Sequence, residues 1–169
     1  MDTAFRRCEE AGYEIVSGYA AVRDPAKWRS VYPVEHFWHG ADLLALGESA
    51  FGYLRGVHYQ NLDIFNDYLE SLTENRLPLR RGLRLRPEEK LRREVILQLK
   101  TGALDAEYFR KKFNTDLHEH FRTEFERLAR ESLMEIDGQK VRLTRQGLLQ
   151  VDALLPRFYL PEHAGIRYT

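Results

Sequence analysis

The segment from Gly47 to Gly52 is the first place where the residue types could carry chemistry. It reads Gly-Glu-Ser-Ala-Phe-Gly and follows the apolar run of residues 41–47, which predicts a strand buried on both faces, as in a parallel sheet. In α/β folds, ligands bind in loops at the carboxyl ends of such strands, and small residues let a ligand approach the backbone closely. The segment therefore predicts a ligand-binding loop, with an ordinary tight turn as the alternative.

A basic stretch between residues 76 and 93 is the second candidate. It holds eight basic residues against two acidic ones. Arginine side chains in such a patch can bind carboxylates or phosphates in bidentate fashion. Arg80 and Arg81 are therefore candidates for binding an anionic substrate, with a solvated linker and helix face as the alternative.

The histidines and the cysteine give no metal site. His36 and His39 lie three residues apart in an expected loop with no third ligand nearby, and His118 and His120 diverge on an expected helix. Cys8 is the one cysteine of the chain, so it can neither close an internal disulfide nor hold an iron–sulfur cluster by itself. No metal is expected in this chain, and the cysteine usage suits a reducing cytoplasm.

The composition limits the class of protein. With 169 residues, the chain is long enough for one domain, or for one domain and part of another. Hydrophobic residues make up 43%, which excludes wholesale disorder, and 26 basic against 26 acidic residues argue against a dedicated nucleic-acid binder. The sequence contains no apolar run of about 18 residues, so no membrane span is predicted. The N-terminus has no apolar signal segment. A cytoplasmic protein is therefore expected.

The first part of the chain, residues 1–60, alternates between helix and strand signals. A helix is expected over residues 3–11 and ends at Gly12, and one strand is expected over residues 13–22. A loop with two prolines and two tryptophans then leads to the buried strand over residues 41–47. This texture is typical of an α/β fold, but it has too few strands to close a barrel.

The second part, residues 61–169, is predicted to be mainly helical. Asn61 is expected to cap a helix that carries Leu62, Phe65, Leu69 and Leu72 on one face. A basic linker over residues 76–86 then leads to a helix that begins at Pro87 and ends at Gly102.

The remainder of this part predicts a winged-helix-like domain. Asp105 is expected to cap a short helix, which a third helix over residues 117–132 follows. Two strands joined at Asp137-Gly138 form a hairpin, and Thr144 caps a closing helix that ends near Pro156. A stand-alone interaction or DNA-binding module is one alternative. Groove binding is disfavoured because the third helix would carry carboxylates toward phosphates, namely Asp116, Glu119, Glu124, Glu126 and Glu131.

An ordered set of short motifs resembles a known family. In chain order the set is Gly12-Tyr13-Glu14, Phe37-Trp38, residues 41–52, Tyr59-Gln60-Asn61, a helix containing Tyr68, residues 77–82, Glu88-Glu89 with Arg92-Arg93, and residues 143–149. It is similar to the C-terminal part of the oxygen-independent coproporphyrinogen III oxidase family of radical SAM proteins, which also includes haem chaperones and haem-degrading relatives. The resemblance covers nearly the whole chain.

The resemblance implies an α+β fold. Residues 1–60 would be the last β/α units of a partial (β/α) barrel, and residues 61–169 the helical, winged-helix-like C-terminal domain. In the family, three cysteines of the barrel hold a [4Fe–4S] cluster that cleaves S-adenosylmethionine, and the resulting radical starts the decarboxylation of tetrapyrrole propionates. Because this chain has one cysteine, we expect a fragment of a longer enzyme that holds no cofactor and is inactive alone.

The resemblance also implies sites and partners. Gly47, Ser49, Ala50 and Phe51 would lie beside bound S-adenosylmethionine, with Phe51 packed on a second cofactor molecule. The expected partners are the missing N-terminal radical SAM domain and a tetrapyrrole substrate or haem, without membrane or nucleic acid. A further partner is a second copy of the chain, since barrel strands would expose apolar residues (Leu43, Leu44 and Leu46). The alternative within the family is a haem chaperone that holds haem through His36 or His39.

Overall fold

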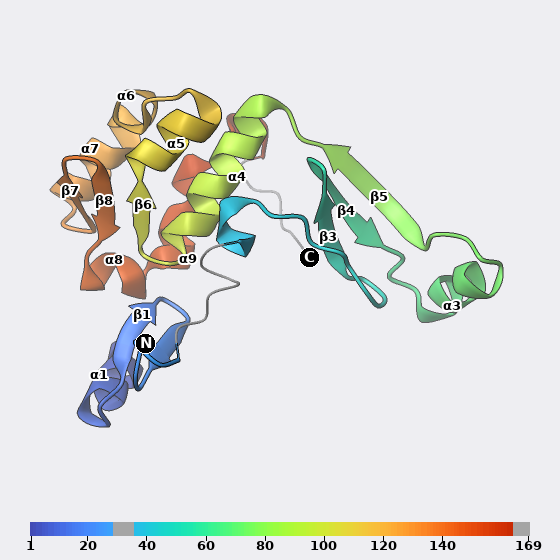
Figure 1. Cartoon of the computed structure of the whole chain (residues 1–169), viewed down its shortest axis with the longest axis horizontal. Coiled ribbons are helices and arrows are strands. Elements are labelled where there is room, and N and C mark those ends of the chain that lie inside the picture. Colours follow the sequence, from blue (N-terminus) through green and yellow to red (C-terminus); the bar gives the residue numbers. More distant parts are fainter. Residues whose placement is uncertain (29–35, 164–169) are drawn as a thin grey trace.

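The computed structural model describes residues 1–28 and 36–163, so part of the predicted proline- and tryptophan-containing loop lies outside the described residues. Figure 1 shows three parts: a small N-terminal piece, a helical domain, and a separate three-stranded sheet that projects from the helical domain and carries a helix at its far end. The fold is mixed, with helices and three antiparallel sheets. No helix in the described ranges is long and apolar enough to cross a bilayer.

The N-terminal piece contains α1 (Asp2–Glu10), β1 (Glu14–Ser17) and β2 (Ala20–Val22). The helix ends as predicted, and Gly12 takes a left-handed φ of 79°. The single strand predicted over residues 13–22 is wrong, because the chain reverses at Gly18 and forms an antiparallel hairpin. The Ser17 side chain promotes the reversal by accepting a hydrogen bond from the amide of Tyr19 at 3.1 Å.

The apolar run over residues 41–47 is not a buried parallel strand. Its one bridge is antiparallel and joins Leu43 to Tyr53, while Leu44 and Leu46 are 68% and 81% exposed. All strand pairs in the described ranges are antiparallel. An apolar run is buried only where neighbouring elements cover both of its faces, and here one face is left open. The assignment of residues 1–60 to barrel units stays a prediction.

The projecting sheet consists of β3 (Phe51–Leu54), β4 (Val57–Asn61) and β5 (Leu79–Arg84), with α3 (Phe65–Thr73) between β4 and β5. Two predictions fail here. The helix begins after Ile64, because Asn61 ends β4 and is buried, and the expected basic linker is strand β5. The sheet therefore crosses the expected domain boundary at residue 60.

Helix α3 has its apolar side turned outward. Phe65, Leu69 and Leu72 are exposed, as predicted for one shared face, but this face meets solvent rather than a core. Ser71 on the other side is buried. Leu44 and Leu46 are exposed as well, and exposed apolar side chains that gather in a patch mark interaction sites.

The helical domain follows the predicted order closely. Pro87 begins α4, Asp105 caps α5 through the amides of Glu107 and Tyr108, and Thr144 caps α8. The Asp137-Gly138 turn joins the two predicted hairpin strands. The elements are α4 (Pro87–Leu99), β6 (Ala103–Asp105), α5 (Ala106–Phe113), α6 (Leu117–His120), α7 (Arg122–Arg130), β7 (Met134–Asp137), β8 (Lys140–Leu143), α8 (Arg145–Leu149), α9 (Val151–Leu154) and two 3₁₀ turns, η2 (Leu155–Phe158) and η3 (Pro161–His163).

Two features of this domain differ from the sequence-based expectation. Strand β6 was not expected, and it pairs with β8 to give a sheet of order β6-β8-β7. The third helix is broken at Phe121 into α6 and α7. At the break, the fully buried ring of Phe121 packs against both Phe125 and Phe158, with ring centroids 6.0 and 5.5 Å away. This aromatic cluster is part of the one large hydrophobic core found in the described residues.

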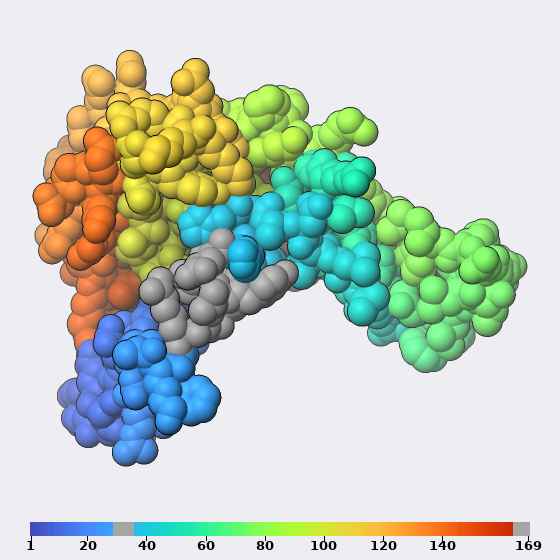
Figure 2. Space-filling view, in the orientation of Figure 1, coloured from blue at the N-terminus to red at the C-terminus, as the bar shows by residue number. Residues whose placement is uncertain are grey.

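Polar contacts hold the N-terminal piece to the helical domain. Tyr19 donates a hydrogen bond to Asp152, and Arg145 pairs with Asp2 at 3.2 Å and Glu9 at 2.6 Å. In Figure 2 the piece, in blue, lies against the orange and red end of the helical domain. These pairs lie at the surface, where each contributes little.

Replacing Phe121 tests the core. We expect Phe121→Ala to lower the free energy of unfolding by about 3–5 kcal/mol, because the change leaves a cavity inside the aromatic cluster. Denaturant unfolding followed by circular dichroism measures the change. Phe65→Ala, at an exposed phenylalanine, is the matched control, and a similar loss in both variants would contradict this placement of the core.

Candidate functional site

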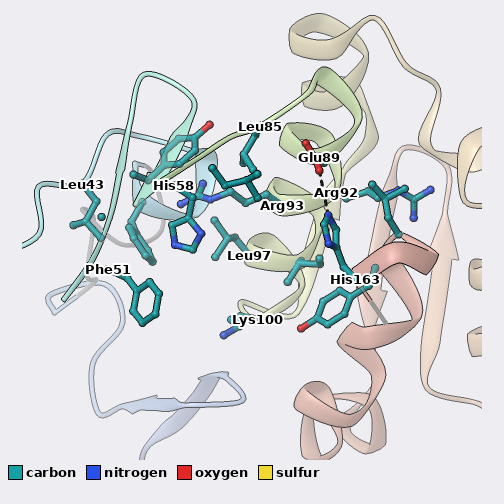
Figure 3. A pocket seen from close by; sticks show the side chains of 17 residues that line it. Leu43, Phe51, His58, Leu85, Glu89, Arg92, Arg93, Leu97, Lys100 and His163 are labelled. Carbon is teal, nitrogen blue, oxygen red and sulfur yellow. Dashed lines mark hydrogen bonds and ion pairs between the residues drawn. The ribbon is translucent and has the colours of Figure 1, made fainter. Parts of the chain in front are cut away.

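A cavity of about 640 Å³ lies between the projecting sheet, α4 and the C-terminal segment at residues 159–163. This volume suits an organic ligand of moderate size. Figure 3 shows Phe51 and His58 of the sheet facing Leu97 and Lys100 of α4 across this space. Apolar side chains cover most of the wall, and a few polar groups converge on it, which is the usual composition of a ligand site.

Strand alternation selects which side chains of the sheet face the cavity. His58 lies between Tyr53 of β3 and Leu83 of β5 in the register, so the three side chains share one face. Phe51 is on the same face, with its ring centroid 5.7 Å from that of His58. The two-residue turn at Arg55-Gly56, in which both residues have positive φ, sets this register.

The imidazole of His58 is half-buried and unpaired. Burial lowers its pKa, and the positive charges of Arg93 and Arg81 lower the pKa further. Neither ring nitrogen has a hydrogen-bond partner within residues 1–28 and 36–163. At neutral pH the side chain is therefore uncharged and free to bind a ligand or a metal. No sequence motif singled out His58, although a strand-turn-strand pattern around Arg55-Gly56 could have placed it on a sheet face.

Two cations line the same cavity, Arg93 of α4 and Lys100, the residue that follows the last turn of α4. Arg93 stacks its guanidinium 3.8 Å from the centroid of the Tyr53 ring, and its Nη1 is buried without a hydrogen-bond partner. Lys100 has a ring contact with Tyr19 at 5.5 Å. Burial lowers the pKa of Arg93, although not enough for an arginine to lose its charge. Neither cation has an ion-pair partner in the described part of the chain, so both are available to an anion.

The C-terminal wall of the cavity is held by an ionic cluster. Arg86 bonds Glu89 at 3.0 Å and also pairs with Glu162, while His163 contacts Glu89 at 3.1 Å. The hydrogen bonds from Arg86 hold the pKa of Glu89 at about 2, so it stays ionised. Glu89, Glu162 and His163 could approach a metal ion, but Arg86 already neutralises the carboxylates. The cluster therefore attaches the C-terminal segment to the start of α4 and keeps Tyr159 and Leu160 in the cavity wall.

A buried carboxylate positions the opposite wall. Glu94 of α4 is 4% exposed and accepts hydrogen bonds from Tyr108 at 2.6 Å and from Lys112 at 2.7 Å. Lys112 also donates to the carbonyl of His39 at 2.8 Å, and a Cβ at Gly40 would overlap the Glu94 carboxylate. These contacts fix the 3₁₀ turn η1 (Phe37–His39) against α4 and α5, and Phe37 then lines the cavity.

The predicted ligand loop is held in place by side chains of β4 and α3. Asn61, which is buried, donates to the carbonyls of Ala45 at 3.4 Å and Gly47 at 2.9 Å. Tyr59 accepts from the amide of Ala45, and Tyr68 from the amide of Gly47. The amide of Ser49 bonds the carbonyl of Leu62 at 2.8 Å. The turn is thus rigid, and the amides of Gly47 and Ser49 are already engaged.

The four residues predicted to contact S-adenosylmethionine separate into two groups. Phe51 lines the cavity, while Gly47, Ser49 and Ala50 form the clamped turn before it. Gly47 takes a φ of 98° and has open space around its Cα, so a ligand can approach it. Their role toward the cofactor stays a prediction.

Arg80 and Arg81 point to opposite faces of β5, because successive strand residues alternate. Arg81 donates to the side chain of Gln60 at 2.8 Å, on the face of His58. Arg80 pairs with Asp63. The structure therefore does not bring the two arginines together, and their role in binding a substrate stays a prediction.

The histidines predicted as alternative haem ligands are placed differently from His58. His39 packs its ring edge-on against Tyr108, with centroids 4.7 Å apart, and its Nδ1 is buried without a partner. His36 precedes the turn η1. Neither lines the cavity.

The residues present do not fit an iron–sulfur cluster. Cys8 is half-buried on α1, and the sequence offers no second thiolate. Three cysteine ligands are required by the family's chemistry, so this chain by itself cannot supply them.

Comparison with known proteins assigns the class of domain. Residues 85–149, from the end of the projecting sheet to α8, match the family model of the HemN C-terminal domain. A solved structure of coproporphyrinogen III oxidase (HemN) from Escherichia coli, described as a radical SAM enzyme, superimposes with a TM-score of 0.74. The match covers 93% of this chain and 39% of the E. coli chain at 21% identity, which shows a shared fold.

The relatives extend the match to most of the chain. The oxygen-independent coproporphyrinogen III oxidase of Pseudomonas aeruginosa is 34% identical over 138 residues, which cover 78% of this chain and 30% of the relative. The haem chaperone HemW of Lactococcus lactis is 26% identical over 129 residues, which cover 75% and 33%. This chain thus spans about a third of these curated relatives. The resemblance to the C-terminal region of the coproporphyrinogen III oxidase family is confirmed.

Replacing Asn61 tests the clamp. We expect Asn61→Ala to cost about 1–3 kcal/mol of stability, because the partly buried carbonyls of Ala45 and Gly47 lose their donor. The amides of Ala45 and Gly47 should exchange hydrogen faster, which NMR-detected exchange measures. Asn66→Ala, at an exposed position of α3, is the control and should leave both amides unchanged. Equal protection in the Asn61 variant would contradict the clamp.

The lowered pKa of His58 predicts a pH dependence of stability. Below the ordinary histidine pKa of about 6.5, the unfolded chain binds a proton that the folded chain resists. Stability should therefore fall as the pH drops from 7 through this value, and His58→Gln should reduce that fall. Urea unfolding between pH 7.5 and 5.5 measures it, with the unaltered chain as the reference. An unchanged slope in His58→Gln would exclude this assignment.

Proposed function

We propose that this chain forms the C-terminal part of a radical SAM protein of the coproporphyrinogen III oxidase type, which acts on tetrapyrrole propionates. The observation that carries the proposal is the cavity, in which apolar walls meet two cations without acidic partners, Arg93 and Lys100. A flat apolar ring bearing carboxylates has the complementary chemistry. The similarity of residues 85–149 to the HemN C-terminal domain supports the same class.

The domain organisation that we propose follows the element order. From α4 to β8 the chain runs helix, strand, helices and hairpin, and the sheet order β6-β8-β7 supports a winged-helix-like domain. The first 60 residues would belong to the barrel side of the protein. The E. coli protein of similar fold is described as a radical SAM enzyme, which supports this class of protein.

The chemistry of the cluster would come from a partner, the N-terminal radical SAM domain. When bound there, the cluster and S-adenosylmethionine supply the radical that starts the reaction, and this chain supplies one wall of the substrate site. The exposed apolar face of α3 and the exposed Leu44 and Leu46 support docking of that domain. A second copy of the chain on the same surface is the alternative, which the oligomeric state in solution distinguishes.

A haem chaperone of the same family is the second candidate function. The similarity to HemW of Lactococcus lactis favours it, as does an uncharged histidine in the cavity. In that case the chain would carry a tetrapyrrole without decarboxylating it.

An S-adenosylmethionine cleavage assay tests the proposal. After anaerobic reconstitution with iron and sulfide, the chain should form no 5′-deoxyadenosine above the blank, because it has one thiolate ligand. The full-length oxidase of Pseudomonas aeruginosa, treated in the same way, is the positive control. Turnover by this chain alone would overturn the proposal that the cluster is supplied by a partner.

A further inference from the structure

The C-terminal segment at residues 159–163 forms one wall of the cavity. Tyr159 and Leu160 line the cavity and are half-buried, whereas Glu162 is exposed. We propose that this segment is a movable lid, which the exposed ion pair between Arg86 and Glu162 holds closed and whose release widens the cavity. The proposal goes beyond the proposed function, because it concerns access to the cavity rather than the ligand.

The segment begins directly after a point at which the chain is fixed. Phe158 is fully buried, and its ring centroid lies 5.5 Å from that of Phe121 and 6.1 Å from that of Phe125. Its carbonyl accepts a hydrogen bond from Arg92 of α4 at 2.9 Å. A motion of the segment would therefore turn about the backbone bonds that follow Phe158, where η2 ends.

The backbone hydrogen bonds that the structure describes for this segment are local. The amide of Tyr159 donates to the carbonyl of Pro156 at 3.1 Å. The amide of His163 donates to the carbonyl of Leu160 at 2.8 Å. Segments with local hydrogen bonds and few buried apolar contacts open at a low cost in free energy.

Side chains attach the segment to the beginning of α4. Glu162 pairs with Arg86, and His163 contacts the carboxylate of Glu89 at 3.1 Å. Glu89 is itself fixed, since its side chain is 8% exposed and accepts a hydrogen bond from the amide of Arg86 at 2.7 Å. In Figure 3 a dashed line joins His163 to Glu89, on the side of the cavity away from His58. The attachment therefore lies at the far end of the segment from its hinge.

The ion pair of the lid is weak enough to open. The side chains of Arg86 and Glu162 are 60% and 53% exposed, so water and salt screen their charges. An exposed pair contributes little to stability, in contrast to the buried ring contacts of Phe158. The closed position is therefore favoured only modestly, and a higher salt concentration should reduce that preference.

Opening would uncover the side of α4 that lies beneath the segment. Ile96 is one helical turn beyond Arg92, which bonds the carbonyl of Phe158, so both side chains are on that side of the helix. Ile96 is half-buried and lines the cavity together with Tyr159 and Leu160. A reactive group at position 96 should therefore report whether the segment is closed.

Alkylation of a thiol at position 96 tests the proposal. The whole chain with Cys8→Ser and Ile96→Cys has a single thiol, and its reaction with the neutral reagent iodoacetamide is followed by intact mass. We expect Glu162→Gln in this background to raise the rate about three- to fivefold, because the closed position loses its ion pair. Raising the salt concentration from about 0.05 to about 0.5 M should raise the rate in the parent and have a smaller effect with Glu162→Gln.

Glu131→Gln is the matched control. It removes the ion pair with Arg157 at 2.8 Å, which attaches η2 to the end of α7 ahead of the hinge, and should leave the rate unchanged. Hydrogen exchange of residues 159–163, in chains that keep Ile96, is a second measurement, and it should be faster only with Glu162→Gln. Circular dichroism and the unfolding midpoint verify that each variant is folded.

The results decide on the lid alone. Equal alkylation and exchange rates with and without Glu162→Gln would overturn the proposal. An equal rise with Glu162→Gln and with Glu131→Gln would overturn it too, because it would indicate a general loosening of the domain. Neither assay contains a tetrapyrrole or a radical SAM domain, so the proposed function stands whichever result is obtained.

Discussion

The arrangement of the molecule depends on one buried charge, the carboxylate of Glu94. A buried carboxylate is costly unless it is paired and hydrogen-bonded, and this one is satisfied by Tyr108 and Lys112 from α5. The same lysine holds the carbonyl of His39, and the carboxylate occupies the space that any side chain at Gly40 would need. Glu94 thus joins α4, α5 and the turn that leads into the projecting sheet.

Because of this attachment, one side of α4 packs in the core and another side lines the cavity. Leu91, Val95 and Leu99 are buried in the core of the helical domain, while Arg93, Ile96 and Lys100 face the cavity. The projecting sheet forms a second wall of the cavity. The C-terminal segment, held by the ion pairs of Arg86, forms a third. A ligand in the cavity would therefore contact elements from both parts of the chain. The proposed ligand site therefore lies at the junction of these parts rather than within either of them.

The helical domain was largely predictable from local patterns, and the projecting sheet was not. Pro87, Asp105 and Thr144 act at the ends of their helices through contacts within one turn, so residue type and spacing were enough to find them. Asn61 looks like a similar cap, yet its amide is used across the sheet by the loop around Gly47. The residues next to Asn61 in the sequence do not reveal whether its side chain caps a helix or bonds a distant loop.

The same difference explains the candidate site. Residue chemistry by itself indicated the loop ending at Phe51, the basic character of residues 76–93 and the lack of cluster ligands, because these depend on composition and order. Tertiary structure decided that residues 41–47 lie partly exposed, that Arg80 and Arg81 diverge on β5, and that His58 and Arg93 line one cavity. Those outcomes depend on strand register and on what covers each face, which are set by contacts between residues far apart in the chain.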